Sequence, residues 1–347
     1  MRTSDCSSEA RGGDAPSFGS RMPHSIGYRP DIDGLRAIAV MAVLVYHAFP
    51  QIVPGGFAGV DIFFVISGYL ITGIIHRQML EKRFSIATFY ARRILRIFPA
   101  LIAVLLATFV IGWFVLTPAE MEALGADIKG AAAFIENFVL HEQFVGYFDP
   151  GAERLPLLHL WSLGIEEQYY IAWPAALLLI SRWPARSVAI VAALAFGSFL
   201  VCVLTPSLDT AWAFYSPTTR GWELLAGSLL ALWPSKDSAV ADRQFDTMLA
   251  IAGLAGIAVA FWAFDSRSPW PGFRTVVPVL GAMALIMTAN TLIHRRMLSA
   301  RPMVFIGLIS YPLYLWHFPL IAFAKLQYGG AAPASLVCGL LVLRAFP

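Results

Sequence analysis

Arg36 and His47 lie in the first long apolar segment, DGLRAIAVMAVLVYHAFP (residues 33–50), and both could do chemistry there. Eleven residues separate them, which on a helix is about three turns and about 16 Å, at nearly the same azimuth. Asp33, fourteen residues before His47, lies close to the same face. The spacing predicts a guanidinium near one end of a helix and an imidazole deep in its body. The alternative is a surface-anchoring Arg36 and a hydrogen-bonded packing role for His47.

A second cluster lies in LLHLWSLGIEEQYYIAWP, residues 157–174. His159, Ser162, Glu166 and Tyr170 follow the spacing of one helical face. Glu167 and Gln168 add polarity at the same depth. Adjacent glutamates are costly in lipid, so we expect at least one of them to face a water-filled cavity. The alternative is a helix that dips only shallowly into the outer interface.

The third cluster is FYARRILRIFPA, residues 89–100, where Arg92, Arg93 and Arg96 precede an apolar run. Arg92 and Arg96 are four residues apart and share a helix face, with Arg93 alongside. Guanidinium groups match phosphate oxygens bidentately, so the cluster predicts a phosphate clamp at the membrane surface. A general positive anchor next to a membrane span is the alternative.

Two further polar residues accompany apolar runs. Asp61 lies near the start of the second apolar run, and His317 lies between aromatic residues and prolines in SYPLYLWHFPL. The sequence has no phosphate-binding loop, no G-x-S-x-G and no H-E-x-x-H pattern. The seven-residue spacing of His159 and Glu166 is not a recognised metal-ligand spacing, so no metal site is expected.

The elements that position these residues are apolar helices. Apolar side chains make up 58% and charged ones 14% of the 347 residues, and the mean hydropathy is +0.67. These values disfavour a soluble domain and predict an all-α, polytopic membrane helix bundle. Its roughly ten spans are expected near 35–52, 57–76, 97–116, 158–181, 187–204, 221–233, 247–264, 275–293, 303–325 and 332–347. A shorter apolar stretch at 128–140 predicts an interfacial or re-entrant helix.

Charge asymmetry predicts the orientation. With a cytoplasmic N-terminus, 19 of the 25 basic residues fall on the inner side of these spans, as the positive-inside rule requires. Residues 1–27 lack an apolar stretch and predict a disordered cytoplasmic tail. Residues 28–347 then form one membrane domain, and no nucleic-acid partner is expected. The three scattered cysteines do not form a disulfide framework.

Taken together, these motifs resemble the membrane-bound acyltransferase-3 family of bacteria over residues 28–325. The resemblance rests on the Arg36-x10-His47 pattern and on GGFAGVDIFFVISGYLIT, FYARRILRIFPA, LLHLWSLGIEEQYYIAWP, TRGWELLAG and ISYPLYLWHFPL. It implies transfer of an acyl group, usually acetyl, from cytoplasmic acyl-CoA to a hydroxyl of a surface glycan such as lipopolysaccharide or exopolysaccharide. The location implied is the bacterial cytoplasmic (inner) membrane, and membrane lipid is an expected partner.

The resemblance also assigns residues. The family's required arginine and histidine match Arg36 and His47, and its arginine pair falls among Arg92, Arg93 and Arg96. The tryptophan–glutamate motif maps onto Trp161, Glu166 and Glu167. TRGWELLAG is most like the subgroup fused to a C-terminal SGNH domain, which this sequence lacks. Either a separate SGNH-type partner completes the transfer, or the sequence is a fragment.

The chemistry implied is general-base or nucleophilic catalysis by His47, with acetyl-CoA as a cosubstrate rather than a permanently bound cofactor. We expect the cytoplasmic arginines, including Arg36, to hold the CoA nucleotide while its pantetheine arm extends about 16 Å towards His47. Glu166 or Asp33 could orient the imidazole. The supporting residues are expected to be Asp33, Asp61, His159, Trp161, Glu167 and His317. Competing classes are a transporter of an anionic solute, which predicts inverted repeats that are not found, and a structural membrane protein.

Overall fold

The computed structural model describes residues 28–143, 145–205, 209–233, 243–289 and 291–328, and all their regular elements are helices. The predicted tail (1–27) and the predicted last span (332–347) lie outside these residues. The long helices are α1 (Pro30–Ala48), α2 (Gly59–Leu80), α3 (Ile86–Val115), α4 (Pro118–Ala132), α6 (Leu160–Ile180), α7 (Ser187–Leu204), α9 (Pro217–Leu232), α10 (Arg243–Ala263), α11 (Val276–Met287) and α13 (Ser310–Gln327). Shorter ones are α5 (Glu136–Glu142), α8 (Thr210–Tyr215), α12 (Arg301–Leu308) and the π-helix His294–Leu298.

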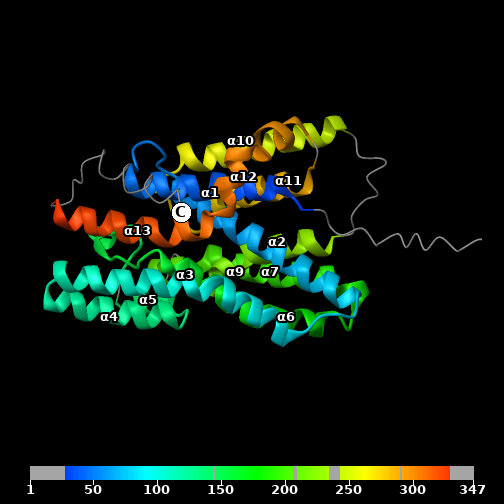
Figure 1. Cartoon of the computed structure of the whole chain (residues 1–347). Helices are drawn as coiled ribbons and strands as arrows, with labels where there is room; N and C mark the ends of the chain where they lie inside the picture. Colours follow the sequence, from blue (N-terminus) through cyan, green and yellow to red (C-terminus); the bar gives the residue numbers. More distant parts are fainter. Residues whose placement is uncertain (1–27, 144, 206–208, 234–242, 290, 329–347) are drawn as a thin grey trace, which may run out of the picture.

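The bundle is organised around α1 and α2, which lie next to each other at its centre (Figure 1). Helix α9 packs along α2 and is covered by α7, while α12 packs on α1 and α10 packs on α11. On the other side of α1, α13 contacts α3. The all-α helical bundle predicted from composition is therefore confirmed.

Four described segments are long and apolar enough to cross a membrane, namely Gly56–Leu80, Ile86–Val115, Pro184–Leu204 and Gln244–Ala263. Helices α12 and α13 add a fifth if the bent pair is counted as one span. The expected count of ten is not reproduced by this criterion. One reason is that α1 and α6 carry the charged residues singled out above, including Asp33, Arg36, Glu166 and Glu167, which lower their hydropathy.

The predicted span 303–325 is broken in the structure. Helices α12 and α13 meet at Ile309 with a bend of 67°. Pro312, in the first turn of α13, has no backbone N–H, and its ring would clash with the carbonyl of Leu308 in a continuous helix. The bend therefore follows from the proline.

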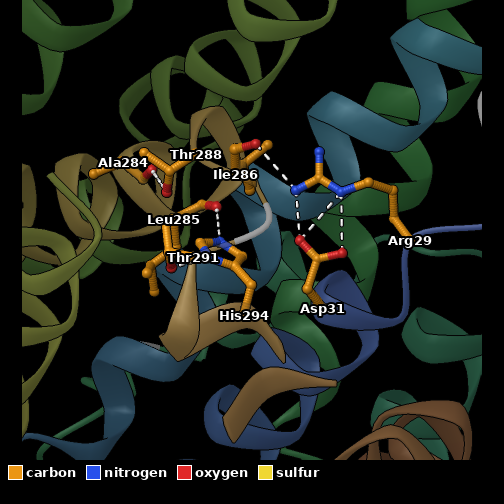
Figure 2. A network of polar contacts seen from close by, with 8 residues as sticks. All are labelled: Arg29, Asp31, Ala284, Leu285, Ile286, Thr288, Thr291 and His294. Carbon is orange, nitrogen blue, oxygen red and sulfur yellow. Dashed lines mark hydrogen bonds and ion pairs between the residues drawn. The ribbon is translucent and has the colours of Figure 1, made fainter. Parts of the chain in front are cut away.

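The predicted span 275–293 also ends early, because α11 stops at Met287. Figure 2 shows side chains that donate to the carbonyls of its last turn. Thr288 donates to the carbonyl of Ala284 (2.8 Å), and His294 donates to that of Leu285 (2.9 Å). Arg29, paired with Asp31 at 2.6 Å, donates to the carbonyl of Ile286. The bond from Arg29 to the Ile286 carbonyl ties the end of α11 to the start of α1.

The stretch predicted as one interfacial or re-entrant helix at 128–140 is instead the turn of a helical hairpin formed by α4 and α5. The turn passes through Phe134, whose φ is +58°. Gln168 of α6 donates to the Phe134 carbonyl (2.7 Å) and to Asn137 (2.8 Å), which fixes the hairpin tip against the middle of α6. At the other end of α5, His141 bonds Asp209 at 3.0 Å and lowers the pKa of that exposed carboxyl.

Close packing of α2 against α9 depends on glycine. A Cβ atom on Gly68 would overlap the Leu224 carbonyl, and one on Gly227 would overlap the Val65 carbonyl. Neither obstacle is a flexible side chain, so the two backbones would have to separate. Small residues of this kind allow helices in a membrane to approach closely.

We expect Gly227→Ala to lower the free energy of unfolding by about 1–3 kcal/mol, because an added methyl group overpacks this contact. The matched control is Gly197→Ala on α7, where a Cβ atom meets open space. Thermal unfolding of the two variants in the same detergent makes the comparison. Equal unfolding temperatures would contradict the assigned close contact.

Candidate active site

A cavity of about 170 Å³ is lined by the arginines of two helices, and we call it the arginine cavity. Arg36 enters it from α1, and Arg93 and Arg96 enter from α3. The acidic residues Glu166 and Glu167 of α6 line the same cavity. Residues far apart in the sequence are thus brought together as positive and negative groups around one cavity.

The arginines and glutamates are held by specific neighbours. The guanidinium of Arg93 lies 3.8 Å from the ring centroid of Tyr170, a cation–π contact that fixes its plane. Glu166 accepts a short hydrogen bond from Ser67 of α2. Within the described part of the chain, Nε of Arg93 is buried without a hydrogen-bond partner. A buried guanidinium N–H without a partner is costly.

Of the three arginines predicted to form the phosphate clamp, two line the arginine cavity. Arg92 is exposed and does not line the arginine cavity, whereas Arg93 and Arg96, three residues apart, do. Residues at both i+3 and i+4 lie on one helix face, so the sequence alone allowed either pair. The stacking of Arg93 on Tyr170 shows which face of α3 turns inwards.

His47 lies at a second cavity of about 290 Å³, which we call the histidine cavity. This cavity is at the opposite end of α1 from Arg36 and is formed by the turn after α1, the segment before α6, the segment after α10 and the end of α13. Its lining residues are Tyr46, His47, Pro50, Pro54, Tyr147, Phe148, Asp149, Glu153, Leu158, Asp265, Ser266, Phe318, Ile321 and Lys325.

A chain of hydrogen bonds runs through the His47 imidazole. Nδ1 of His317 lies 2.6 Å from the carbonyl of Tyr314, which can only accept, so this nitrogen carries the proton. In the neutral ring, Nε2 of His317 is then an acceptor for Nδ1–H of His47, at 2.9 Å. The same reasoning leaves Nε2 of His47 as a bare acceptor, and the Tyr147 hydroxyl donates to it at 2.7 Å.

The partner of His47 therefore differs from the expected one. The sequence predicts Glu166 or Asp33 as the group that orients the imidazole, but Glu166 bonds Ser67, and Asp33 accepts from Tyr28 at 2.6 Å. His317 of α13 occupies that position instead. His159, predicted as a supporting residue, packs edge-to-face on His317 with ring centroids 5.3 Å apart and donates to the Leu315 carbonyl.

Tyr147 was not recognised from the sequence. It lies in a connecting segment without helical periodicity, so no spacing pattern marks it. Its ring stacks on Phe214 with centroids 4.5 Å apart, and Trp161 packs against it at 6.1 Å. Trp161, assigned a supporting role, thus holds the tyrosine that contacts the catalytic candidate His47.

The two cavities are separated. Among the described residues, none lines both. The partition is the stretch Tyr314–Phe318 of α13, in which Tyr314 lines the arginine cavity and Phe318 lines the histidine cavity. The Tyr314 hydroxyl bonds Ser162 of α6 at 2.6 Å and donates to the His159 carbonyl at 2.8 Å, which closes this layer. His317 lies within it and contacts His47.

Asp61 lines neither cavity. It forms an ion pair with Arg220 of α9 at 2.8 Å, and Arg220 also pairs with Glu223 at 3.2 Å. All three side chains are fully buried. The Arg220 guanidinium lies 5.5 Å from the ring centroid of Trp161 and 5.6 Å from that of Phe214. Arg220 therefore holds α2 and α9 together and supports the aromatic rings of Trp161 and Phe214, which pack against Tyr147.

We expect Arg220→Ala to destabilise the protein by about 3–5 kcal/mol, because it leaves two carboxylates buried without a counter-charge. Arg182→Ala, at an exposed position after α6, is the matched control. Thermal unfolding in detergent and the yield of monodisperse protein measure the difference. Adding Asp61→Asn to Arg220→Ala should recover part of the loss, whereas no recovery would contradict the charge argument.

Comparison with known proteins gives consistent matches. A family model described as an acyltransferase domain, that of the acyltransferase-3 family, matches residues 29–344. A peptidoglycan O-acetyltransferase from Listeria monocytogenes is 36% identical over 315 residues, covering 86% of this chain and 50% of the relative. An O-acetyltransferase from Staphylococcus aureus is 34% identical over 325 residues, covering 88% of this chain and 52% of the relative.

A third similar protein is described as a putative peptidoglycan O-acetyltransferase from Bacillus subtilis, 34% identical over 312 residues, which cover 85% of this chain and 49% of the relative. The chain thus spans about half the length of the curated relatives it matches. No solved structure matches the chain.

Proposed function

Because the chain belongs to the acyltransferase-3 family, we propose that it is an O-acetyltransferase that transfers an acetyl group from cytoplasmic acetyl-CoA to a hydroxyl of a cell-wall glycan across the membrane. The observation that carries the proposal is the bare Nε2 atom of His47, which the His317 and Tyr147 hydrogen bonds fix at the wall of the histidine cavity. A neutral imidazole nitrogen held in this way can act as a general base.

The arginine cavity is the proposed donor site. Arg36, Arg93 and Arg96 supply three permanent positive charges, which suit the phosphate groups of a coenzyme A nucleotide. Nε of Arg93, which has no hydrogen-bond partner among the described residues, is the proposed donor to one of these phosphate groups. Acetyl-CoA binds here as a cosubstrate. Its pantetheine arm extends from the arginines along α1 towards His47, so the closed Tyr314–Ser162 layer has to open during the reaction.

In the proposed transfer, Nε2 of His47 removes the proton from the acceptor hydroxyl as its oxygen attacks the thioester carbonyl. The carbon–sulfur bond breaks, and the protonated His47 gives its proton to the departing thiolate, so ester and thiol are formed without net change in protons. His317 keeps the imidazole in the required tautomer. An acyl-histidine intermediate would use the same nitrogen, because Nδ1 is already engaged.

The acceptor is proposed from the relatives, whose names include peptidoglycan O-acetyltransferase. Peptidoglycan is therefore favoured over the lipopolysaccharide or exopolysaccharide suggested by the family resemblance alone. We further propose that the chain lies in the bacterial cytoplasmic membrane with its N-terminus in the cytoplasm. This orientation places the arginine cavity towards acetyl-CoA and the histidine cavity towards the wall. A separate SGNH-type protein remains a candidate partner for the final transfer.

We expect His47→Ala to reduce acetylation of muropeptides at least about 10²-fold, because it removes the proposed base. His76→Ala is the matched control, since His76 is a partly buried histidine on α2 that lines neither cavity. Mass spectrometry of muropeptides from cells that express each variant at equal level gives the measurement. Unchanged acetylation in His47→Ala would remove the residue from the mechanism.

We expect Arg93→Ala to raise the KM for acetyl-CoA by about 10- to 150-fold, because a charge-assisted hydrogen bond contributes about 1.5–3 kcal/mol. Arg92→Ala, one residue away and exposed, should leave the KM unchanged. Both variants remove one positive charge from the same turn, so the comparison separates contact from general charge. Equal effects would indicate a surface anchor, not a donor site.

A further inference from the structure

The histidine cavity differs from the arginine cavity in the sign of its charge. Asp149, Glu153 and Asp265 line it together with a single cationic side chain, Lys325. All three carboxylates are exposed at its rim, and each comes from outside the long helices. With a neutral His47, the lining carries an excess of negative charge. A concave site lined by one sign of charge attracts oppositely charged groups and repels like ones.

The remaining lining favours a carbohydrate. Tyr46 and Phe148 provide aromatic surface, Ser266 provides a hydroxyl, and carboxylate oxygens accept hydrogen bonds from sugar hydroxyls. The cavity volume of about 290 Å³ is at the lower end of the range for small-molecule sites, which suits one ring of a glycan and not a longer segment.

Two of the carboxylates at the rim already accept hydrogen bonds and can accept more. Asp265 is partly engaged, since it accepts hydrogen bonds from the Arg267 amide and the Ser268 hydroxyl. Asp149 accepts from the Gly146 amide at 2.7 Å. Each still has lone pairs for a ligand. The Tyr147 hydroxyl on Nε2 of His47 occupies the position that an acceptor hydroxyl must take before it loses its proton.

We propose that the histidine cavity binds one sugar ring that is uncharged or carries a free amino group, and that its carboxylate rim excludes sugars bearing carboxylate or phosphate groups. The bound ring replaces the Tyr147 hydroxyl at His47 with one of its own. This inference rests on the proposed function, because it specifies the acceptor class of that reaction.

The test uses three disaccharide probes and the full chain in nanodiscs. The probes are N,N′-diacetylchitobiose, which is neutral, chitobiose, which carries amino groups, and digalacturonate, which carries carboxylates. Binding is measured by saturation-transfer NMR at low and at high salt. We expect digalacturonate to bind at least tenfold more weakly than the other two at low salt, with a smaller difference at high salt because ions screen the rim.

A double variant, Glu153→Gln with Asp265→Asn, should reduce this discrimination at least threefold. The matched control is Glu142→Gln, an exposed carboxylate near the end of α5 that does not line the cavity. Equal binding of all three probes to the wild type would overturn the inference. So would binding of none of them, or the same discrimination in the double variant as in Glu142→Gln.

Ester formation on the same probes, in proteoliposomes loaded with acetyl-CoA, separates this inference from the proposed function. Selective binding without any ester would contradict the transfer reaction and leave the site assignment intact. Ester formed equally well on digalacturonate would support the reaction and overturn the charge selectivity.

Discussion

The architecture depends on one buried ion-pair cluster, in which Arg220 of α9 lies between Asp61 of α2 and its own neighbour Glu223. A buried guanidinium is stable only where it is compensated, so α2 and α9 must meet at this point and in this register. The glycine contacts of Gly68 and Gly227 let the two backbones come close enough. The aromatic rings packed over the guanidinium, Trp161 and Phe214, then hold Tyr147 against His47. An ion-pair cluster whose members line neither cavity thereby supports the position of the imidazole through Tyr147.

The second organising feature is the division of polar groups between the two cavities. Arg36 and His47 share one helix, yet they line different spaces with opposite charge. The layer between them is built from Tyr314, Ser162 and His317, which are joined to backbone carbonyls and to one another. A continuous solute pathway would need an opening here. In this structure the layer separates the proposed donor site from the proposed acceptor site, and the proposed transfer requires it to open.

Much of this could be predicted from the sequence, and the failures have physical reasons. The eleven-residue spacing of Arg36 and His47 on one helix is a local property, and local periodicity can be recognised in the sequence. The choice between Arg92 and Arg93 depends on the rotation of α3, which is fixed by its neighbour Tyr170 on a distant helix. Pro312 is a sequence signal for the break at Ile309. The apolar run continues past this proline, and its length predicted one unbroken span. The pairing of His47 with His317, 270 residues apart, depends on tertiary packing alone.

The hydrogen-bond chain through His47 ends at the Tyr314 carbonyl, and a peptide carbonyl cannot take up a proton at ordinary pH. The two imidazoles therefore do not form a path along which a proton can be relayed. A proton that arrives at Nε2 of His47 has no onward route through His317 and must leave by the atom it entered. If the proposed transfer takes place at this site, the acyl group changes sides of the membrane without net movement of charge. The membrane potential would then neither drive nor oppose that step.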